Sequence, residues 1–517
     1  MQQSITEKIV RNTIFNAVGR FWTILLLLLL TPYIIRHLGN DRFGIWALVS
    51  VLTGYFGLLD FGIGTSFTKY FAEYYTKKDH QKINQIISTG FVIYFILALL
   101  LITIMVLAMN PLLKLFNIPE NMHGEASFVF LIGIILFGIS NTLSPFKVLQ
   151  TGLQRMDVTN KIAIILSFPN IIGTIIFLEM GYGLRGLMIN NAILVILTGI
   201  ITIIASYKIF PELRFGFSFF QKEMLKTLFN FGYKVEIAIV ALIITSQTDK
   251  LFITALLSVS LVTYYQLGNS IVQAVLALAT LFVSAITPAF AEIEAKGERQ
   301  LLITAYIRMT KYLSFITIPS FIFILISASN IMAIWMGPGY AQAALIIQIL
   351  SIGWMINKIA HVGSTVSQAI EQPQLMAKGA LITIILTIIL GITFIKIFGF
   401  AGVAWGTTIA LIIGTFYFQY KLHSSLGIPI KTLVATTAPF LFMCIIATSA
   451  VIGIDFIIAA LHISQFGIMG WISFAVRIII FSTIYLLCVY YAKLFDAIDI
   501  DLFRQRIPLF NKLIKNI

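Results

Sequence analysis

The stretch IISTGFVIYFILALLLITIMVLAM, residues 86–109, contains no charged residue and is almost wholly apolar. An apolar stretch of about 20 residues is long enough to cross the hydrocarbon core of a bilayer as one α-helix. A membrane-spanning barrel would instead need alternating segments of about ten residues. The apolar runs therefore predict an all-α polytopic membrane protein with fourteen transmembrane helices. Their expected extents are 12–35, 43–65, 86–109, 128–150, 160–179, 184–207, 235–256, 261–290, 309–333, 342–368, 376–396, 401–420, 432–454 and 470–492.

The composition of the whole chain also indicates a membrane protein. Its 517 residues include 35 Lys or Arg and 21 Asp or Glu, so that 11% are charged while 59% are hydrophobic. An average soluble chain is about 25% charged, and a soluble globule could not keep this much apolar surface away from water. These values exclude a water-soluble enzyme, a disordered tail protein and a secreted disulfide scaffold. The two cysteines, Cys444 and Cys488, lie in apolar runs and have no metal-binding spacing.

The distribution of basic residues predicts the orientation. If the N-terminus lies in the cytoplasm, 26 of the 35 Lys and Arg residues fall on the inner side and 5 on the outer side. Cytoplasmic loops of membrane proteins carry such an excess. We therefore expect a multi-pass protein of the bacterial cytoplasmic (inner) membrane with both termini in the cytoplasm. The net charge of +14 is then an orientation signal that faces anionic lipid, and it does not indicate a nucleic acid as partner.

The most polar interruption between spans, about residues 208–234, divides the first six helices from the next six. Both sets begin on the cytoplasmic side, as parallel repeats would. We expect an N-terminal lobe over 1–210, a C-terminal lobe over 211–425 and two extra helices over 426–492. The last part, 493–517, is expected to be a cytoplasmic amphipathic tail, because its apolar residues recur at helical spacing. Those residues are Phe503, Ile507, Phe510, Ile514 and Ile517.

Polar residues inside the predicted spans fall on common helical faces. A charge at the bilayer centre costs about 2.5–3.5 kcal/mol on insertion scales, so these residues should face protein or water. The longest such face lies on the tenth predicted helix, includes Lys358 and His361, and predicts a water-filled cavity. His361 beside Lys358 is a candidate proton-sensitive site. The candidate substrate-binding residues of this polar, cationic cleft are Asn16, Arg20, Lys250, Gln266, Asn269, Gln273, Lys358 and His361.

Two carboxylates in the predicted spans are candidates for ion coupling or for charge pairs. Asp60 lies at a similar expected depth to Arg20, so the two could neutralise each other, which need not exclude a role in substrate binding. Asp249 and Lys250 are expected to cap or pair helices, with an ion-carrying role as the alternative. Arg477, near the outer end of the fourteenth helix, is expected to extend its guanidinium toward the membrane surface.

The charges within the spans also predict the chemistry of the substrate. Basic residues outnumber carboxylates there, so the cavity should be net cationic as well as rich in hydroxyl and amide groups. Such a cavity suits an anionic, heavily hydroxylated substrate, of which a diphosphate-linked sugar is one example. A lipophilic cationic drug would instead prefer carboxylates and aromatic rings.

Several motifs are similar to those of a known family. They are LG at 38–39, FGIW at 43–46, LLDFGIG at 58–64, PELR at 211–214 and DK at 249–250. With these motifs the chain resembles the polysaccharide flippases, the O-antigen and capsule repeat-unit translocases of the multidrug/oligosaccharidyl-lipid/polysaccharide exporter superfamily. The resemblance implies two six-helix lobes in a V, with helices 1, 2, 7 and 8 lining a central cleft to which Arg20 contributes positive charge. It also implies alternating access, with the sugar and diphosphate in the cleft and the lipid tail in the bilayer.

The favoured hypothesis is a flippase that moves an undecaprenyl-diphosphate-linked oligosaccharide repeat unit from the inner to the outer leaflet. No catalytic residue, metal or cofactor is expected. The sequence has no Walker A motif, so an ion gradient or consumption of the product would drive transport. The expected partners are the lipid-linked anionic oligosaccharide, membrane lipids, and the polysaccharide polymerase with its chain-length machinery.

Two alternatives stay open at this stage. One is a peptidoglycan-precursor or multidrug exporter of the same superfamily. The other belongs to a different class, a membrane-embedded glycosyltransferase or polymerase. Such an enzyme would need carboxylates at a membrane surface and a sizeable outer loop, and the longest outer loop expected here runs only from about residue 110 to residue 127.

Overall fold

The structure, a computed structural model, describes residues 5–460 and 467–496 together with residue 499. Within these ranges it does not describe the side chains of residues 5–17, 20, 234–239, 241, 242, 284, 285, 288, 457 and 459. The predicted amphipathic tail at 493–517 therefore lies mostly outside the described residues. All regular secondary structure in the described part is helical, which confirms the all-α prediction.

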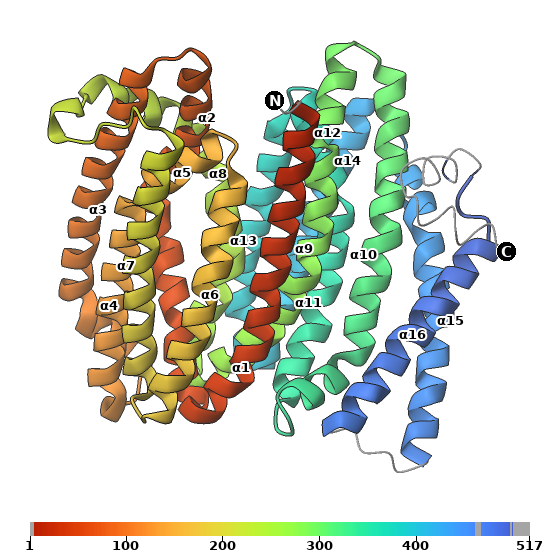
Figure 1. The fold of residues 1–517 in the computed structure, drawn as a ribbon. Helices are drawn as coiled ribbons and strands as arrows, with labels where there is room; N and C mark the ends of the chain where they lie inside the picture. The colour runs from red at the N-terminus through yellow and green to blue at the C-terminus, as the bar shows by residue number, and fades with distance from the viewer. Residues whose placement is uncertain (1–4, 461–466, 497–498, 500–517) are drawn as a thin grey trace. The chain divides into compact units, whose positions relative to one another are not determined.

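Sixteen α-helices follow one another along the described chain (Figure 1). The first eight are α1 (Ile5–Gly57), α2 (Ile63–Thr76), α3 (His80–Leu115), α4 (His123–Thr142), α5 (Ser144–Gly152), α6 (Met156–Glu179), α7 (Gly183–Ile209) and α8 (Lys222–Leu256). The last eight are α9 (Val259–Ala295), α10 (Arg299–Trp335), α11 (Ala341–Ile359), α12 (His361–Ala369), α13 (Pro373–Phe398), α14 (Phe400–Leu426), α15 (Lys431–Ala460) and α16 (Gly467–Tyr491).

Twelve helical segments among the described residues are long and apolar enough to cross a membrane. The first of them, Phe21–Asp60, has 40 residues and contains a break at Gly39, so it is long enough for two crossings. α8 is 35 residues long but is not one of these twelve segments. The structure does not describe the side chains of several residues in its middle, 234–239, 241 and 242. The chain is therefore a multi-pass membrane protein, while the number of fourteen spans stays a prediction.

The second span is predicted to run as one helix from 43 to 65, and its predicted C-terminal end is wrong. α1 runs through the first two predicted spans with one non-helical residue, Gly39, at φ 76° and ψ 171°. The helix then stops, and a short 3₁₀ turn, η1 (Leu58–Asp60), follows it. Phe61 and Gly62 next adopt left-handed backbone, with φ values of 50° and 72°, which a right-handed helix cannot contain. α2 begins directly after this break.

The span predicted at 128–150 is divided into α4 and α5 at Leu143. Pro145 stands at the start of α5 and has no backbone N–H. The carbonyl oxygen of Asn141 therefore cannot receive the helical hydrogen bond from the residue four positions later. Hydropathy alone does not register this interruption, because every residue around it is compatible with a membrane helix.

The span predicted at 342–368 is divided into α11 and α12 at Ala360. The side-chain amide of Gln419 donates to the carbonyl oxygen of Ala360 at 3.2 Å, and this bond occupies the carbonyl at the break. The break falls between Lys358 and His361. The polar face predicted for one continuous helix is thus shared by two shorter helices.

Packing divides the chain into two compact units. Unit 1 comprises Met1–Leu267 and Ala380–Ala410, and unit 2 comprises Gly268–Gly379 and Leu411–Ile517. α8 belongs to unit 1 because it packs against α1, α2 and α3. The division into lobes expected over 1–210 and 211–425, with two extra helices over 426–492, stays a prediction.

In unit 1, α2 and α8 cross at two glycines. A Cβ atom on Gly62 would overlap the carbonyl oxygen of Gly232, and a Cβ on Gly232 would overlap the backbone of Gly62. One turn further along α2, the hydroxyl of the buried Ser66 donates to the carbonyl oxygen of Leu228 at 2.7 Å. The two helices approach this closely because neither glycine has a side chain.

In unit 2, α10 lies beside α15 and α16 (Figure 1). The hydroxyl of Tyr485 on α16 donates to the carbonyl oxygen of Phe315 on α10 at 2.9 Å. Arg477 is only 1% exposed, and its Nε donates to a carboxylate oxygen of Asp455 on α15 at 2.7 Å. The prediction that Arg477 extends toward the membrane surface is therefore wrong, because its charge is compensated between the two helices.

Gly62→Ala should lower the thermal unfolding midpoint of the detergent-solubilised protein, because the new methyl group overlaps Gly232 and the backbone must stay left-handed. The left-handed backbone costs about 1–2 kcal/mol for a residue other than glycine, and overpacking costs about 1–3 kcal/mol more. Gly297→Ala is the matched control, since Gly297 has a φ of 70° but a Cβ atom added there would meet no atom within 4 Å. Equal midpoints for the two variants would contradict the close crossing.

Candidate functional site

Asp249 lies at the centre of a buried polar cluster in unit 1. Its side chain is completely buried on α8, and both carboxylate oxygens accept from the hydroxyl of Thr407 on α14, at 2.6 and 2.8 Å. The hydroxyl of Tyr265 on α9 donates to the same carboxylate. Both donors are themselves buried. Asp249 therefore joins three helices through hydrogen bonds that satisfy its oxygens.

Lys250 is the neighbouring residue on α8 and has a different environment. Its side chain is 3% exposed, and Nζ donates to the amide oxygen of Gln247 at 3.1 Å. The structure pairs it with no carboxylate among the residues that it describes. The carboxylate of the adjacent Asp249 attracts this ammonium electrostatically but accepts no hydrogen bond from it, so that its one acceptor among the described residues is a neutral amide.

α1 covers this part of α8. Gly54 lies against the side chain of Gln247, where a Cβ on the glycine would be 3.4 Å from Cγ. The hydroxyl oxygens of Tyr55 and Thr248 are 2.7 Å apart and share a hydrogen bond. The segment Gln247–Lys250 therefore places four consecutive polar side chains inside unit 1, as the sequence analysis expected for residues too polar to face lipid.

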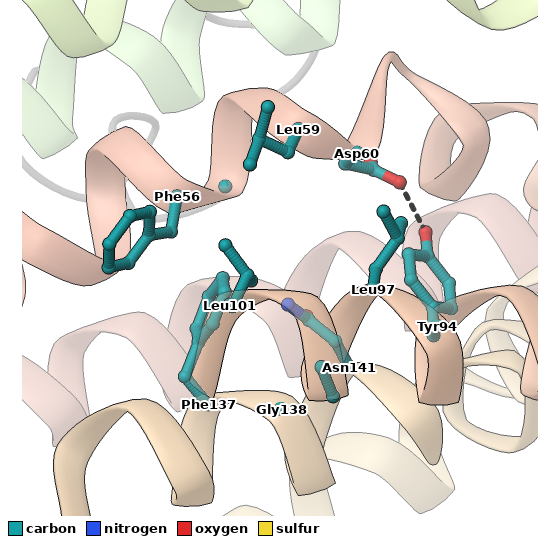
Figure 2. A pocket seen from close by; sticks show the side chains of 11 residues that line it. Phe56, Leu59, Asp60, Tyr94, Leu97, Leu101, Phe137, Gly138 and Asn141 are labelled. Atoms are coloured by element: carbon teal, nitrogen blue, oxygen red, sulfur yellow. Dashed lines mark hydrogen bonds between the residues drawn. The ribbon is translucent and has the colours of Figure 1, made fainter. Parts of the chain in front are cut away.

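Asp60 lies in a separate pocket of unit 1, at the break between α1 and α2. Figure 2 shows its side chain beside that of Tyr94 on α3, whose hydroxyl donates to Oδ1 at 2.5 Å. The backbone N–H of Gly64 lies 3.2 Å from both carboxylate oxygens. The pocket has a volume of about 20 Å³, which is room for about one water molecule. It is lined by Phe56, Gly57, Leu59, Asp60, Tyr94, Leu97, Ala98, Leu101, Phe137, Gly138 and Asn141.

The other predicted site residues occupy several places. Gln266, on the unit 1 part of α9, is half-buried, whereas Gln273 is exposed further along the same helix. In unit 2, Nζ of Lys358 lies 5.8 Å from the centre of the Trp354 ring, which is a cation–π contact. His361, at the start of α12, has Nδ1 3.3 Å from the hydroxyl of Ser364. Asn269 is half-buried on α9.

Two predicted residues lie on α1 where side chains are not described. Arg20 and Asn16 are both within the helix, but nothing in the described part of the chain places their side chains. The hypothesis that Arg20 neutralises Asp60 therefore stays a hypothesis. The positive charge that Arg20 would bring to the cleft is likewise a prediction.

Several residues of these clusters were missed by the sequence analysis. Tyr94 and Tyr265 donate to the carboxylates of Asp60 and Asp249, but tyrosine counts as apolar in a composition scan. In unit 2, the hydroxyl of Tyr306 is 3.0 Å from the amide oxygen of Gln419 and 3.0 Å from Nε2 of His423. The hydropathy pattern predicts that the twelfth helix ends at residue 420, which places His423 in a loop, whereas α14 continues to Leu426 and includes His423. A tyrosine that shares a helical face with polar residues could have indicated that its hydroxyl belongs to a polar cluster.

The described residues do not form a metal site of the usual kind. No three His, Cys, Asp or Glu side chains in this part of the chain come together as a bound metal would require. The polar groups instead form hydrogen-bonded clusters around single carboxylates and single cations. Such clusters suit the binding of charged or hydroxylated groups within a membrane protein.

Sequence comparison places this arrangement in a family. A family model described as polysaccharide biosynthesis protein matches residues 9–294, which is more than half of the chain and reaches from α1 almost to the end of α9. The chain belongs to the polysaccharide biosynthesis protein family. This membership confirms the resemblance to the polysaccharide flippases that the motifs indicated.

Individual relatives of this family member are distant. A probable low-salt glycan biosynthesis flippase of Haloferax volcanii is 21% identical over 400 residues, which cover 76% of this chain and 79% of that protein. A putative O-antigen transporter of Shigella flexneri is 18% identical over 374 residues, which cover 71% of this chain and 87% of that protein. Both names describe transporters. This protein is accordingly a flippase or transporter of the multidrug/oligosaccharidyl-lipid/polysaccharide exporter superfamily.

A solved structure shares the fold. A lipid II flippase in an inward closed conformation matches this chain with a TM-score of 0.71 at 19% sequence identity, covering 94% of this chain and 99% of that one. At this identity the likeness shows the fold alone. The helical architecture of the superfamily thus extends over nearly the whole of this chain.

Thr407→Val should destabilise the protein, because the buried carboxylate of Asp249 loses a hydroxyl donor. Removing one partner of a buried hydrogen bond costs about 1–3 kcal/mol, measured as a lower thermal unfolding midpoint in detergent. Thr387→Val on α13 is the matched control. Thr387 is also fully buried, but its hydroxyl has no hydrogen-bond partner in the described part of the chain, so its loss should be neutral or stabilising. A similar decrease for both variants would contradict the role of the Thr407–Asp249 bond.

Proposed function

We propose that this protein moves an undecaprenyl-diphosphate-linked oligosaccharide repeat unit from the inner to the outer leaflet of the bacterial cytoplasmic membrane. Transport uses alternating access, and both termini lie in the cytoplasm. The positive charges of Arg20, Lys250 and Lys358 bind the anionic part of the substrate. The hydroxyl-rich sugar is bound by the polar side chains of the other candidate residues. They are Asn16, Gln266, Asn269, Gln273 and His361.

The buried ammonium group of Lys250 carries this proposal. Its one hydrogen-bond acceptor among the described residues is the neutral amide of Gln247, at 3.1 Å. Burying a charge costs several kcal/mol, and the carboxylate of Asp249 offsets this cost by electrostatic attraction alone, because its hydrogen bonds go to Thr407 and Tyr265. A diphosphate that enters between α1 and α8 supplies further negative charge and the oxygen acceptors that the ammonium does not receive from Asp249. Because α1 covers this part of α8 at Gly54 and Tyr55, substrate binding requires the two helices to separate there.

The physical need for a protein path supports the same proposal. Charged phosphates and many hydroxyl groups cannot enter hydrocarbon without losing their hydration, which costs several kcal/mol for each polar group. Buried polar side chains replace that hydration, and the lipid tail can stay in the bilayer. The sequence has no Walker A motif, so an ion gradient or consumption of the product drives transport. Asp60 and Asp249 are the candidates for ion coupling or for charge pairs.

A peptidoglycan-precursor exporter is the second candidate. It is supported by the fold shared with the lipid II flippase, at a TM-score of 0.71. The family model and the two glycan-transporter relatives favour a polysaccharide repeat unit instead. A multidrug exporter is less compatible with Lys250, because a cationic drug would be repelled by a buried ammonium. The polysaccharide polymerase and its chain-length machinery are the proposed partners of the exported product.

Lys250→Met should reduce export of the lipid-linked glycan by on the order of tenfold or more, since a charge-assisted contact contributes about 1.5–3 kcal/mol. Methionine keeps the length and apolar stem of lysine, so the change removes mainly the charge. The measurement is surface polysaccharide in a host that carries only this variant, together with the lipid-linked glycan that accumulates on the cytoplasmic side. The identity of that accumulated lipid separates a polysaccharide repeat unit from a peptidoglycan precursor.

Lys226→Met provides the control for this experiment. Lys226 lies on the same helix, nearer its start and outside the polar segment Gln247–Lys250, and its replacement should leave export unchanged at equal protein level. Export at the normal rate by the Lys250→Met variant, with protein amounts matched, would refute the proposed role of the buried cation.

A further inference from the structure

The break between α1 and α2 joins the Asp60 pocket to the crossing of α2 on α8. Asp60 is the last residue of η1, and its carboxylate is 3.2 Å from the N–H of Gly64 in the first turn of α2. Phe61 and Gly62, the two left-handed residues between them, both contact α8. The ring of Phe61 is 5.9 Å from that of Phe229, centre to centre, and Gly62 lies against Gly232. The carboxylate thus holds the turn that docks on α8.

We propose that Asp60 is a proton-binding site whose occupancy controls the contact between α2 and α8. This inference rests on the proposed function and deepens it, because it names the coupling ion and the contact on which the ion acts. The ionised carboxylate accepts hydrogen bonds from Tyr94 and from Gly64, and so fixes the first turn of α2. The proton comes from water and converts the carboxylate to a carboxylic acid. When α2 docks again, the same proton returns to water.

Protonation changes which hydrogen bonds Asp60 can make. A carboxylate accepts at both oxygens, whereas a carboxylic acid has one O–H group that must donate. Asn141 on α4 lines the same pocket (Figure 2), and its side-chain amide can turn its oxygen toward that O–H as an acceptor. The acid then accepts the Gly64 N–H at its uncharged carbonyl oxygen alone, and this bond is weaker than the one to the carboxylate. The cap on the first turn of α2 weakens, and the crossing of Gly62 on Gly232 loosens.

The pocket favours a proton over a metal cation. Hard metal ions take about six oxygen ligands. Of the eleven residues that line the pocket, three carry polar side chains, namely Asp60, Tyr94 and Asn141, and the rest present carbon atoms. Three side chains supply too few oxygens for a dry metal site. One carboxylate that exchanges hydrogen-bond partners is sufficient for a proton.

The charged groups around the pocket are few. Asp60 from η1 and Tyr94 from α3 are its titratable lining residues, while α1 and α4 contribute groups that do not titrate. Along α2 the first basic residue is Lys69, whose Nζ lies 4.8 Å from the Tyr70 ring centre and 4.2 Å from that of Phe231 on α8. On α1, Arg20 is the basic residue that the sequence places at a similar depth to Asp60.

The proposal can be tested by measuring how fast a cysteine at position 66 of α2 reacts with a water-soluble reagent, because the rate reports how well α8 covers this position. Ser66 is completely buried against α8, so Ser66→Cys, in a chain with Cys444 and Cys488 replaced by alanine, should react slowly with a water-soluble maleimide. Thr76→Cys, exposed at the end of the same helix, corrects for the intrinsic pH dependence of the thiol. The ratio of the two rates should rise about tenfold as the full-length protein in nanodiscs goes from about pH 8 to about pH 5.

Three variants decide what causes this response. Asp60→Asn, which cannot ionise, should give the high ratio at both pH values. Tyr94→Phe should move the midpoint to higher pH, because the carboxylate loses a donor that stabilises its charge. Arg20→Gln should keep the response. The proposal is overturned if the ratio does not change with pH, if the change persists in Asp60→Asn, or if Arg20→Gln abolishes it. It is also overturned if sodium in place of choline, at constant pH, produces the change.

A second measurement does not depend on labelling. Infrared difference spectra of the full-length protein between the two pH values should contain the carbonyl band of a protonated carboxylic acid, absent from Asp60→Asn and present in Asp79→Asn. Asp79 caps the start of α3, and asparagine preserves that cap. An unchanged band in Asp60→Asn would refute proton binding there. Neither readout uses a substrate, so their failure leaves the flippase proposal standing, and failure of the Lys250→Met experiment leaves this one standing.

Discussion

Hydrocarbon offers no hydrogen bonds, and this constraint shapes the whole chain. Every backbone N–H and C=O group inside a bilayer must find its partner within the protein, and a continuous α-helix achieves this locally. The described secondary structure is accordingly helical throughout. At two of the breaks, a side chain binds the backbone. Asp60 receives the N–H of Gly64 after the first break, and the amide of Gln419 joins the N–H of Gly363 at the carbonyl of Ala360.

Because hydrocarbon offers no hydrogen bonds, charged side chains inside the membrane also need partners within the protein. Whether a charged side chain has such a partner helps to distinguish a structural role from a functional one. Asp249 is satisfied by two hydroxyl donors, and Arg477 is paired with a carboxylate. Both arrangements connect helices and leave little charge uncompensated. Lys250 is attracted by the adjacent Asp249, but its hydrogen bond in the described part of the chain goes to a neutral amide. Its ammonium therefore keeps the capacity to bind oxygen atoms of an anionic ligand, which is the role proposed for it.

Where α1, α2 and α8 meet, the helices pack closely but are held by few contacts, so that they could separate. Two glycines bring the backbones together without interlocking side chains, so the contact depends on short-range packing and on a few hydrogen bonds. Asp60 controls the most local of these, the cap on the first turn of α2. A transporter needs such a contact, because alternating access requires helices that close tightly and still open. A single carboxylate at the edge of the crossing can therefore influence a much larger movement.

The sequence by itself determined the membrane class, the helical architecture and the family, since hydropathy, helical spacing and short motifs are local properties of the chain. It did not reveal the breaks at Phe61, Leu143 and Ala360, because each consists of residues that are also compatible with a continuous helix. Only the tertiary structure identified the partner of each buried charge. Asp249 and Thr407 are 158 residues apart, and Arg477 is compensated by Asp455 from the preceding helix. Hydrogen bonding acts over about 3 Å of space, and which groups come that close depends on how the helices pack.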